Sequence, residues 1–519
     1  MKRVRSWIAV IVAPLLVACG GAAPPDPPAR PVANVAKVAP PAPARESRTP
    51  PGETPDAPFR AHRPAAGPIA PFTPPTIESF ALRNGLPIHL VERHDLPVVV
   101  VDVVVRGGTA ALDRADHFAG RALGSLMPKG TSHRSALAIA DGFQALGATY
   151  DVSVNVDAAR ANVKALAPDL ERALDLLSDV VLHPTFPADE IARLKAEWGA
   201  REEQQKLDMD LLSWSATELA LYGPAHPYGR PPIADRSDVA AITRASLVRA
   251  HARAFDPSRA AIVVVGDTTR ASVAPLLEKA FGAFRPVAPP AAAPPVVPPA
   301  PSGAGGAPRI VLVDRPGATQ SIVLLAEPAL AYGSPDRHAF RLMSVILGGF
   351  WMSRLNANLR EEKGYSYWVS SSTNGRRVAG PFRAGGAMLA EKTSAAITEM
   401  LGEVRRMRDQ PVSKEELDGA KTFLTHFLRA PFETAAGTAG ALAFLLTYEL
   451  PLDDWRTQAA RIDAVTAEGV KAVATKYLHP DAMRIIVVGD RAKVEGGLAA
   501  LGLGDVELRD AFGKLARPR

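Results

Sequence analysis

A gapless internal repeat constrains the fold of this chain more than any other feature of its sequence. ITRASLVRAHARAFDPSRAAIVVVGD, at residues 242–267, aligns with VTAEGVKAVATKYLHPDAMRIIVVGD, at residues 465–490, so that Thr243 pairs with Thr466 at an offset of 223 residues. Each copy predicts a Thr-capped helix, a turn at an Asp-Pro or His-Pro pair, and a strand that ends in Gly-Asp. A period of this length indicates a duplicated domain and excludes a solenoid of short repeats.

Segments rich in proline and alanine mark the limits of the two copies. A chain of 519 residues is long enough for two domains with full-sized cores. We therefore expect a signal segment, a disordered tether, an N-terminal domain, a Pro/Ala/Gly linker and a C-terminal domain. Their expected limits are residues 1–19, 20–75, 76–285, 286–308 and 309–519, respectively.

The composition excludes some classes of function. Hydrophobic residues make up 47% of the chain, as expected for a globular protein, and the 60 basic residues exceed the 54 acidic ones by only 6. That net charge is too small to indicate a nucleic-acid partner, and no basic run with interleaved aromatic residues occurs. We expect no binding to nucleic acid.

The N-terminus resembles the signal of a bacterial lipoprotein. Basic residues at positions 2, 3 and 5 precede an apolar run at residues 7–17, which is too short to span a bilayer. The segment ends in Leu-Val-Ala-Cys-Gly, with Cys19 at the position that is lipidated in such signals. We expect a lipid-anchored protein of the cell envelope, on the periplasmic face of the outer membrane if the organism has two membranes. Cys19 is the only cysteine, so no intramolecular disulfide is expected.

A second informative segment is DHFAGRALGSLMPKGT, residues 116–131. Apolar residues recur in it three and four positions apart, which predicts an amphipathic helix. Asp113 or Asp116 is expected to cap its start, and Pro128 followed by Gly130 is expected to end it. The opposite stripe of the helix consists of His117, Gly120, Arg121, Gly124 and Ser125.

With KGT after an apolar pair, this segment resembles the active-site helix of the insulinase/pitrilysin family of zinc proteases. In that family the helix carries H-x-x-E-H, whose two histidines bind zinc and whose glutamate is the general base. Counting back from Gly130, the three family positions fall on Arg121, Gly124 and Ser125. The resemblance implies a protease scaffold that has lost its metal ligands and its base. We therefore expect no catalytic residue, metal ion or other cofactor on this chain.

One family ligand has a counterpart further along the chain. The third zinc ligand of the family is a glutamate on a later helix, here expected from Asp189 to about Leu211. Glu202, 77 residues after Ser125, is the nearest match, and Glu203 is the alternative. Either would be a remnant, because a single carboxylate does not hold zinc.

An apparent metal motif, H-L-V-E-R-H, begins at His89 and ends at His94. It is one residue too long for the inverted zinc motif, and its surroundings alternate as in a strand. In a strand these two histidines point to opposite faces and cannot share a metal ion. We interpret them as ordinary surface histidines.

The second domain contains LGGFWMSRLNANLREEKGYSYWVSSS, residues 347–372, which resembles a motif of the family's C-terminal domain. Arg360 and Tyr367 fall on the positions of an arginine and a tyrosine that reach the substrate in family proteases. An arginine fork and a phenol hydroxyl on a cleft wall can hold a peptide carbonyl or a carboxylate. The alternative is that Arg360 pairs with Glu361 or Glu362 and that Tyr367 packs in a sheet.

The resemblance extends over residues 77–510 and implies the fold class. It predicts an α+β protein of two duplicated αβ-roll domains, each a sheet packed with helices on one side, which face each other across a cleft. The family motif LYGPAHPYGRPPI, at residues 221–233, is expected to shape that cleft.

Three functions are compatible with these features. The favoured one is a non-catalytic chain that binds peptide or unfolded protein for a metal-bearing homologue, which supplies the zinc in a hetero-oligomer. A self-associating chain is an alternative arrangement. The second function is that of a purely structural or binding protein of the envelope. The third is an active zinc endopeptidase, which would need ligands that the motif positions do not provide.

The sequence also predicts the outcome of restoring the motif. The triple variant Arg121→His, Gly124→Glu, Ser125→His is expected to fold and to take up zinc with the help of Glu202. Replacing Gly124 should favour the helix by up to ~1 kcal/mol. That gain would be lost if Gly120 and Gly124 allow another segment to approach closely.

Overall fold

The computed structural model describes residues 73–285 and 309–516, which belong to one compact unit, Ile69–Arg519. The predicted signal with Cys19, almost all of the predicted tether and the predicted linker lie outside the described residues. Within the described ranges, no helix has the length and hydropathy that crossing a membrane requires.

The N-terminal half contains a mixed six-stranded sheet in the order β1-β2-β6-β3-β5-β4. Strand β3 is a valine-rich run that is antiparallel to both β5 and β6, whereas β2 is parallel to β6. Seven consecutive residues of β3 are buried, so both faces of the sheet are covered there. The strands are Glu78–Ala81, Pro87–Glu92, Val98–Arg106, Thr149–Val154, Ala158–Leu166 and Ala260–Gly266 for β1 to β6.

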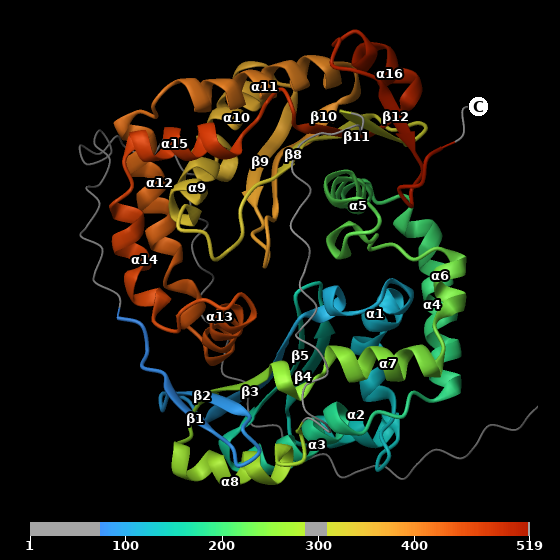
Figure 1. Cartoon of the computed structure of the whole chain (residues 1–519), viewed down its shortest axis with the longest axis vertical. Helices are drawn as coiled ribbons and strands as arrows, with labels where there is room; N and C mark the ends of the chain where they lie inside the picture. The colour runs from blue at the N-terminus through green and yellow to red at the C-terminus, as the bar shows by residue number, and fades with distance from the viewer. Residues whose placement is uncertain (1–72, 286–308, 517–519) are drawn as a thin grey trace, which may run out of the picture. The chain divides into compact units, whose positions relative to one another are not determined.

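Eight helices belong to the described part of this half. Helices α1, α2, α3, α7 and α8 contribute apolar side chains to one core against the sheet, and the first turns of α4 join them. Figure 1 shows α2, α3 and α8 below the strands of this sheet. The helices are His117–Leu126, Ala136–Ala145, Leu170–Leu182, Ala188–Gln205, Met209–Tyr222, Arg236–Ala241, Arg244–Ala254 and Arg270–Phe281 for α1 to α8.

The C-terminal half repeats this arrangement with the sheet order β12-β7-β11-β8-β10-β9. Strand β11, from the second copy of the sequence repeat, takes the same position in its sheet as β6 in the first. The edge strand β9 pairs with β10 as β4 pairs with β5. The strands are Ile310–Asp314, Gln320–Pro328, Ser366–Thr373, Pro381–Leu389, Arg484–Gly489 and Val506–Arg509 for β7 to β12.

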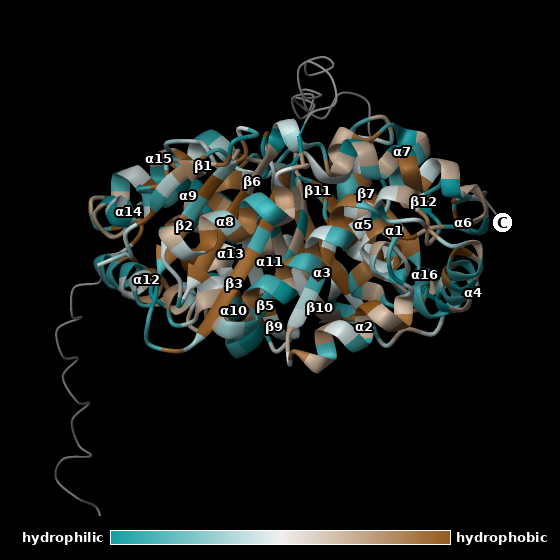
Figure 2. Ribbon diagram, turned by 90° about the horizontal axis from the view of Figure 1, so that it is seen from below, coloured by the Kyte–Doolittle hydropathy of each residue, from teal (hydrophilic) through white to brown (hydrophobic). Residues whose placement is uncertain are grey.

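Helices α9, α11, α12, α15 and α16 contribute to the core of this half, and two π-helical segments, Val345–Gly349 and Ala357–Glu362, overlap its family motif. Figure 2 shows apolar colour along strands such as β2 and β3 and polar colour on outer helices such as α12 and α14. The helices are Arg337–Ser344, Arg354–Asn356, Thr393–Asp409, Lys414–Phe427, Ala435–Thr447, Asp454–Asp463, Ala467–Tyr477 and Arg491–Ala499 for α9 to α16.

The two halves exchange helices across their sheets. Helix α13 of the C-terminal half packs Leu442 and Leu445 against the outer face of the N-terminal sheet, at Val100 and Val263. Helix α5 of the N-terminal half packs reciprocally on β7, β8 and β11. The α+β class with two duplicated αβ domains is therefore confirmed, and the structure adds a helix from the other half on the second face of each sheet.

One predicted helix is wrong in its extent. The sequence predicts a single helix from Asp189 to about Leu211, whereas α4 ends at Gln205 and α5 begins at Met209. The cause is Asp208, whose carboxylate accepts a hydrogen bond from the backbone N–H of Leu211 at 3.0 Å and so caps a new helix. The break allows α5 to leave its own half and reach the other sheet.

Candidate functional site

Helix α1 carries the motif positions, and its start differs from the expectation. Neither Asp113 nor Asp116 caps the helix through its side chain. Asp116 is buried and accepts a hydrogen bond from Arg249 Nη2 of α7 at 2.7 Å, and Asp113 accepts one from Arg253 Nη1 at 2.9 Å. These ion pairs fix α1 to α7 and leave no carboxylate for capping.

Two of the three motif positions of α1 face solvent, and the third lies against a neighbouring strand. Arg121 and Ser125 are solvent-accessible, and Gly124 is half-buried against edge strand β4. A Cβ atom at position 124 would lie 2.5 Å from the carbonyl oxygen of Val152, which is closer than real Cβ atoms approach backbone. Burial by the surrounding protein lowers the pKa of Arg121, although its side chain remains accessible. The close approach considered from the sequence is thus present.

The motif positions do not fit zinc. A guanidinium, a glycine and a hydroxyl offer neither imidazole nor carboxylate to a metal ion. His117, one turn before Arg121, is buried and its Nε2 lies 3.3 Å from the carbonyl oxygen of Pro231. Burial lowers its pKa to about 3, with a further contribution from the positive charges of Arg121 and Arg230. His117 is therefore neutral, but it is engaged with the backbone.

The carboxylate on α4 that the sequence predicts as a remnant ligand pairs with two cationic side chains. Glu202 is buried, with Lys206 Nζ at 2.8 Å and Arg236 Nε at 3.7 Å from its oxygens. Glu203, the alternative, is exposed and pairs with the same Lys206 at 2.8 Å. Among the described residues, the one group of three His, Asp or Glu side chains with metal-ligand spacing lies elsewhere.

The two histidines of the apparent motif have separate partners. His89 Nδ1 lies 2.9 Å from Ser79 Oγ on β1, whereas His94 Nδ1 lies 2.8 Å from Asp267 Oδ1 after β6. His89 lies in β2 but His94 lies two residues beyond its end, so the expected strand geometry holds for His89 alone.

In the second half, Arg360 and Tyr367 come together. The guanidinium carbon of Arg360 lies 5.4 Å from the ring centroid of Tyr367 and 3.9 Å from that of Trp351. Trp351 also contacts Trp368 edge to face, with centroids 4.8 Å apart. We call Trp351, Arg360, Tyr367 and Trp368 the Arg360 cluster.

The Arg360 cluster is open to solvent. The side chain of Tyr367 is 78% exposed, so it does not pack within the sheet, and neighbouring Met352 is 83% exposed. Arg360 Nε does lie 3.4 Å from Glu361, as one alternative predicted, and its side chain, which stacks on the aromatic rings, is 25% exposed. Exposed aromatic rings beside an arginine form a surface suited to binding peptide.

A buried asparagine positions the strand that carries this surface. Asn356 Nδ2 donates to the carbonyl oxygen of Val369 at 2.7 Å, and the backbone N–H of Val369 donates to Asn356 Oδ1 at 3.1 Å. The side chain thus pairs with one residue of edge strand β9. Sequence reasoning missed Asn356 and Trp351, although the asparagine after Leu355 and the adjacent Trp-Met pair were both visible in the motif.

The loop at residues 221–233 joins the two halves. The Tyr222 hydroxyl donates to the carbonyl oxygen of Ala379 at 2.9 Å. The Tyr228 hydroxyl donates to Asp157 Oδ1 at 2.7 Å and accepts from the backbone N–H of Arg377 at 3.3 Å. Burial raises the pKa of Tyr228, so the hydroxyl stays protonated as a donor. The loop's tyrosines hold the halves together.

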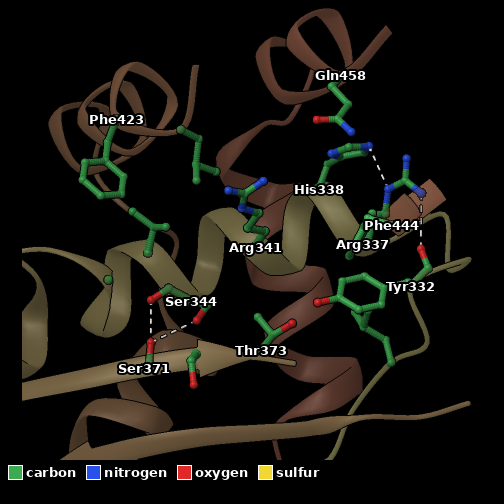
Figure 3. Close-up of a pocket in the computed structure, with 15 residues that line it drawn as sticks. Tyr332, Arg337, His338, Arg341, Ser344, Ser371, Thr373, Phe423, Phe444 and Gln458 are labelled. Atoms are coloured by element: carbon green, nitrogen blue, oxygen red, sulfur yellow. Dashed lines mark hydrogen bonds between the residues drawn. The ribbon is translucent and has the colours of Figure 1, made fainter. Parts of the chain in front are cut away.

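A cavity of about 470 Å³ lies between α9, the end of β9 and the helices α12 to α14. Figure 3 shows Arg341, Tyr332 and Thr373 along its wall, with Ser344 and Ser371 hydrogen-bonded to each other at 3.1 Å. Burial lowers the pKa of His338 to about 4, so this imidazole is neutral at pH 7. The cavity opens beside the end of β9, the strand that also carries Tyr367, and polar side chains line it there.

The fold and these sites define a protease scaffold of the insulinase type, and comparison with known proteins supports that class. Residues 93–222 match the family model described as insulinase (peptidase family M16), and residues 241–424 match the model described as peptidase M16 inactive domain. The chain therefore belongs to the insulinase family, peptidase family M16.

Relatives and solved structures support this assignment. An uncharacterized zinc protease of Mycobacterium bovis is 28% identical over 394 residues, which are 73% of this chain and 85% of that protein. A peptidase M16 inactive domain from Pseudomonas fluorescens is 27% identical, with a TM-score of 0.73 over 80% of this chain and 98% of that chain. The periplasmic protease PqqL from Escherichia coli shares the fold, at 16% identity and a TM-score of 0.67 over 86% of this chain and 49% of that chain.

Proposed function

We propose that this chain is a non-catalytic, substrate-binding member of the insulinase family. It presents peptide or unfolded protein to a metal-bearing homologue, which contributes the zinc and the general base. The observation that carries this proposal is the contrast between two motifs of one chain. Helix α1 has no ligand at any of its three metal positions, whereas Arg360 and Tyr367 lie together on an open surface.

The chemistry of the Arg360 cluster supports a role in binding. A peptide that lies along edge strand β9 could add backbone hydrogen bonds to the sheet. The Arg360 fork would then donate to a carbonyl or carboxylate of that peptide, and the aromatic rings would cover its apolar side chains. The solved relative from Pseudomonas fluorescens is described as an inactive domain, which agrees with a family division between catalytic and non-catalytic chains.

Location at the cell envelope is part of the proposal. It rests on the lipoprotein-like segment that ends at Cys19 and on the periplasmic description of the neighbour from Escherichia coli. Cys19→Ala should release the protein from the membrane fraction. Retention of that variant on membranes in high salt would mean that another protein holds it there.

The test of the proposed function is reconstitution. The full chain is mixed with a metal-bearing insulinase-family homologue of the same organism, and cleavage of an unfolded peptide is followed. Cleavage should increase on mixing, and Arg360→Ala should lower turnover roughly tenfold or more, since hydrogen bonds to a charged donor contribute about 1.5–3 kcal/mol. Tyr367→Phe should have a smaller effect in the same direction.

Arg405→Ala is the matched control. Arg405 is an accessible arginine of the same half that pairs with Asp481 at 2.9 Å, away from the Arg360 cluster. Its replacement should leave turnover in the mixture unchanged. Equal turnover of the Arg360→Ala variant and the native chain would show that the motif serves only packing. If cleavage does not increase on mixing, the chain is not a partner of the metal-bearing homologue. The remaining function is then that of a purely structural or binding protein.

A further inference from the structure

Two histidines and an aspartate meet on the N-terminal half, outside both family motifs. His133 Nδ1 lies 2.7 Å from Asp179 Oδ1, and His183 Nδ1 lies 3.3 Å from the same oxygen. The two imidazoles are perpendicular, with centroids 4.9 Å apart. One ligand atom from each of the three side chains lies within 4.8 Å of the others.

These side chains come from two segments that the fold brings together. Asp179 lies in the last turn of α3 and His183 follows the helix, whereas His133 lies in the loop between α1 and α2. An isolated bridge between Thr131 and Pro184 holds the two segments side by side. The histidines are 50 positions apart in the sequence, so no local spacing indicates the group.

The carboxylate is already oriented toward the histidines. Asp179 is buried, and its second oxygen, Oδ2, accepts hydrogen bonds from Thr131 Oγ1 at 2.7 Å and from Arg134 Nη1 at 2.6 Å. Its first oxygen, Oδ1, therefore remains directed at both imidazoles. Outer partners that fix one oxygen of a carboxylate while the other faces the ligand position are a regular feature of metal sites.

The local charge also favours a cation. Arg134 pairs with Asp175 at 2.6 Å as well as with Asp179, so two carboxylates share one guanidinium. Apart from the two histidines, these two carboxylates and one guanidinium carry a net negative charge. The histidine side chains are 59% and 45% exposed, which leaves one side open to water and gives both rings room to turn.

We propose that His133, Asp179 and His183 bind a zinc ion or a similar borderline divalent ion. Two imidazole nitrogens and one carboxylate oxygen form a common ligand set for such ions, with water in the fourth position. Bond lengths of about 2.0–2.2 Å require the imidazoles to move slightly apart from Oδ1 and toward each other. The site is independent of the proposed function, and the expectation of a metal-free chain rested on the α1 positions alone.

Zinc binding to the purified full chain, measured by titration calorimetry after chelator treatment, tests this inference. One zinc ion should bind per chain, and Mg²⁺, which prefers oxygen ligands, should not compete. His133→Ala or His183→Ala should each weaken zinc binding by at least tenfold, and the double variant should abolish it. Both side chains are exposed, so circular dichroism should report native folding for each variant.

His479→Ala is the matched control. His479 is an exposed histidine whose Nδ1 lies 2.9 Å from the buried carboxylate of Glu327, and Glu327 is not part of any three-ligand group among the described residues. Its replacement should leave zinc binding unchanged. Absence of zinc binding by the native chain, or an unchanged stoichiometry in the double histidine variant, would overturn the proposal and leave the group as ion pairs that join the loop to α3.

Discussion

Gly124 stands where the family motif has its glutamate. The packing around it explains why a side chain does not fit at this position. The carbonyl of Val152 on β4 occupies the space that a side chain would need. The sequence predicts that the triple variant at positions 121, 124 and 125 folds and takes up zinc, and this contact argues against it. A glutamate at position 124 requires β4 to move, so loss of the motif includes a change in backbone packing.

Gly124→Ala should therefore destabilise the protein, contrary to the helix propensity of the two residues. Overpacking costs about 1–3 kcal/mol and exceeds the helix gain of up to ~1 kcal/mol. Gly402→Ala is the control, because Gly402 lies within α11 and a Cβ there meets no atom within 4 Å. The midpoint of urea unfolding should fall for the first variant and rise for the second. A rise in the urea midpoint for both variants would mean that α1 and β4 can move apart without loss of stability.

We expect His117 to make the folded protein less stable as the pH falls. Its pKa is about 3 in the folded protein and about 6.5 in an unfolded chain, so the unfolded state takes up the proton first as the pH falls. Its contribution to stability is thus complete above about pH 6.5 and is lost at about 1.4 kcal/mol per pH unit below that. His117→Gln should reduce the slope of unfolding free energy between pH 6 and 4.5. An identical slope in the variant would place this sensitivity elsewhere, for example at His338, whose pKa is also lowered.

At the scale of elements, the exchanged helices α5 and α13 couple two halves that are far apart in the sequence. Leu442 on α13 is fully buried in a cluster with Val91, Val100 and Val263 of the N-terminal sheet. Neither sheet would be covered on both faces if its half were isolated. We infer that the halves unfold together.

Leu442→Ala should lower the free energy of unfolding by about 2–5 kcal/mol. It should also increase amide hydrogen exchange in β3 and β6, which belong to the other half. Leu137→Ala on α2 is the control, because that leucine is 69% exposed and should change neither quantity. Native protection of β3 and β6 in the Leu442→Ala variant would contradict the coupling.

The elements were largely predictable from the sequence, and their partners were not. Periodicity located α1, and the repeat predicted the Thr-capped helices α7 and α15 and equivalent positions for β6 and β11. The break between α4 and α5 was missed, because the residues on both sides of Asp208 have a helical pattern and a single capping residue does not interrupt it. That break sends α5 across to the other sheet, a consequence of tertiary packing that no local pattern contains.

The same distinction applies to the sites. The positions of Arg121, Gly124 and Ser125 followed from the motif, because that spacing is local. The stacking of Arg360 between Trp351 and Tyr367 depends on how β9 lies beside the π-helical segment, and the pairing of His133 with His183 depends on two loops. Contacts between distant segments require the fold.

At the scale of the whole molecule, the proposed function requires a peptidase scaffold that binds peptide and has no metal chemistry at its motif. Both halves retain their sheets, their cores and the loop that joins them. Zinc content by itself does not test the proposed loss of catalysis, since the group at His133 and His183 is expected to take up zinc. Peptidase activity of a variant that lacks these two histidines does test it.

The most direct measurement is cleavage of an unfolded peptide by the purified full chain alone, carrying His133→Ala and His183→Ala, with and without added zinc. We predict no cleavage under either condition, because the motif positions of helix α1 offer no metal ligand and no general base. Cleavage that stops with a chelator and returns with zinc would contradict it, and would show that this chain builds a catalytic metal site of its own.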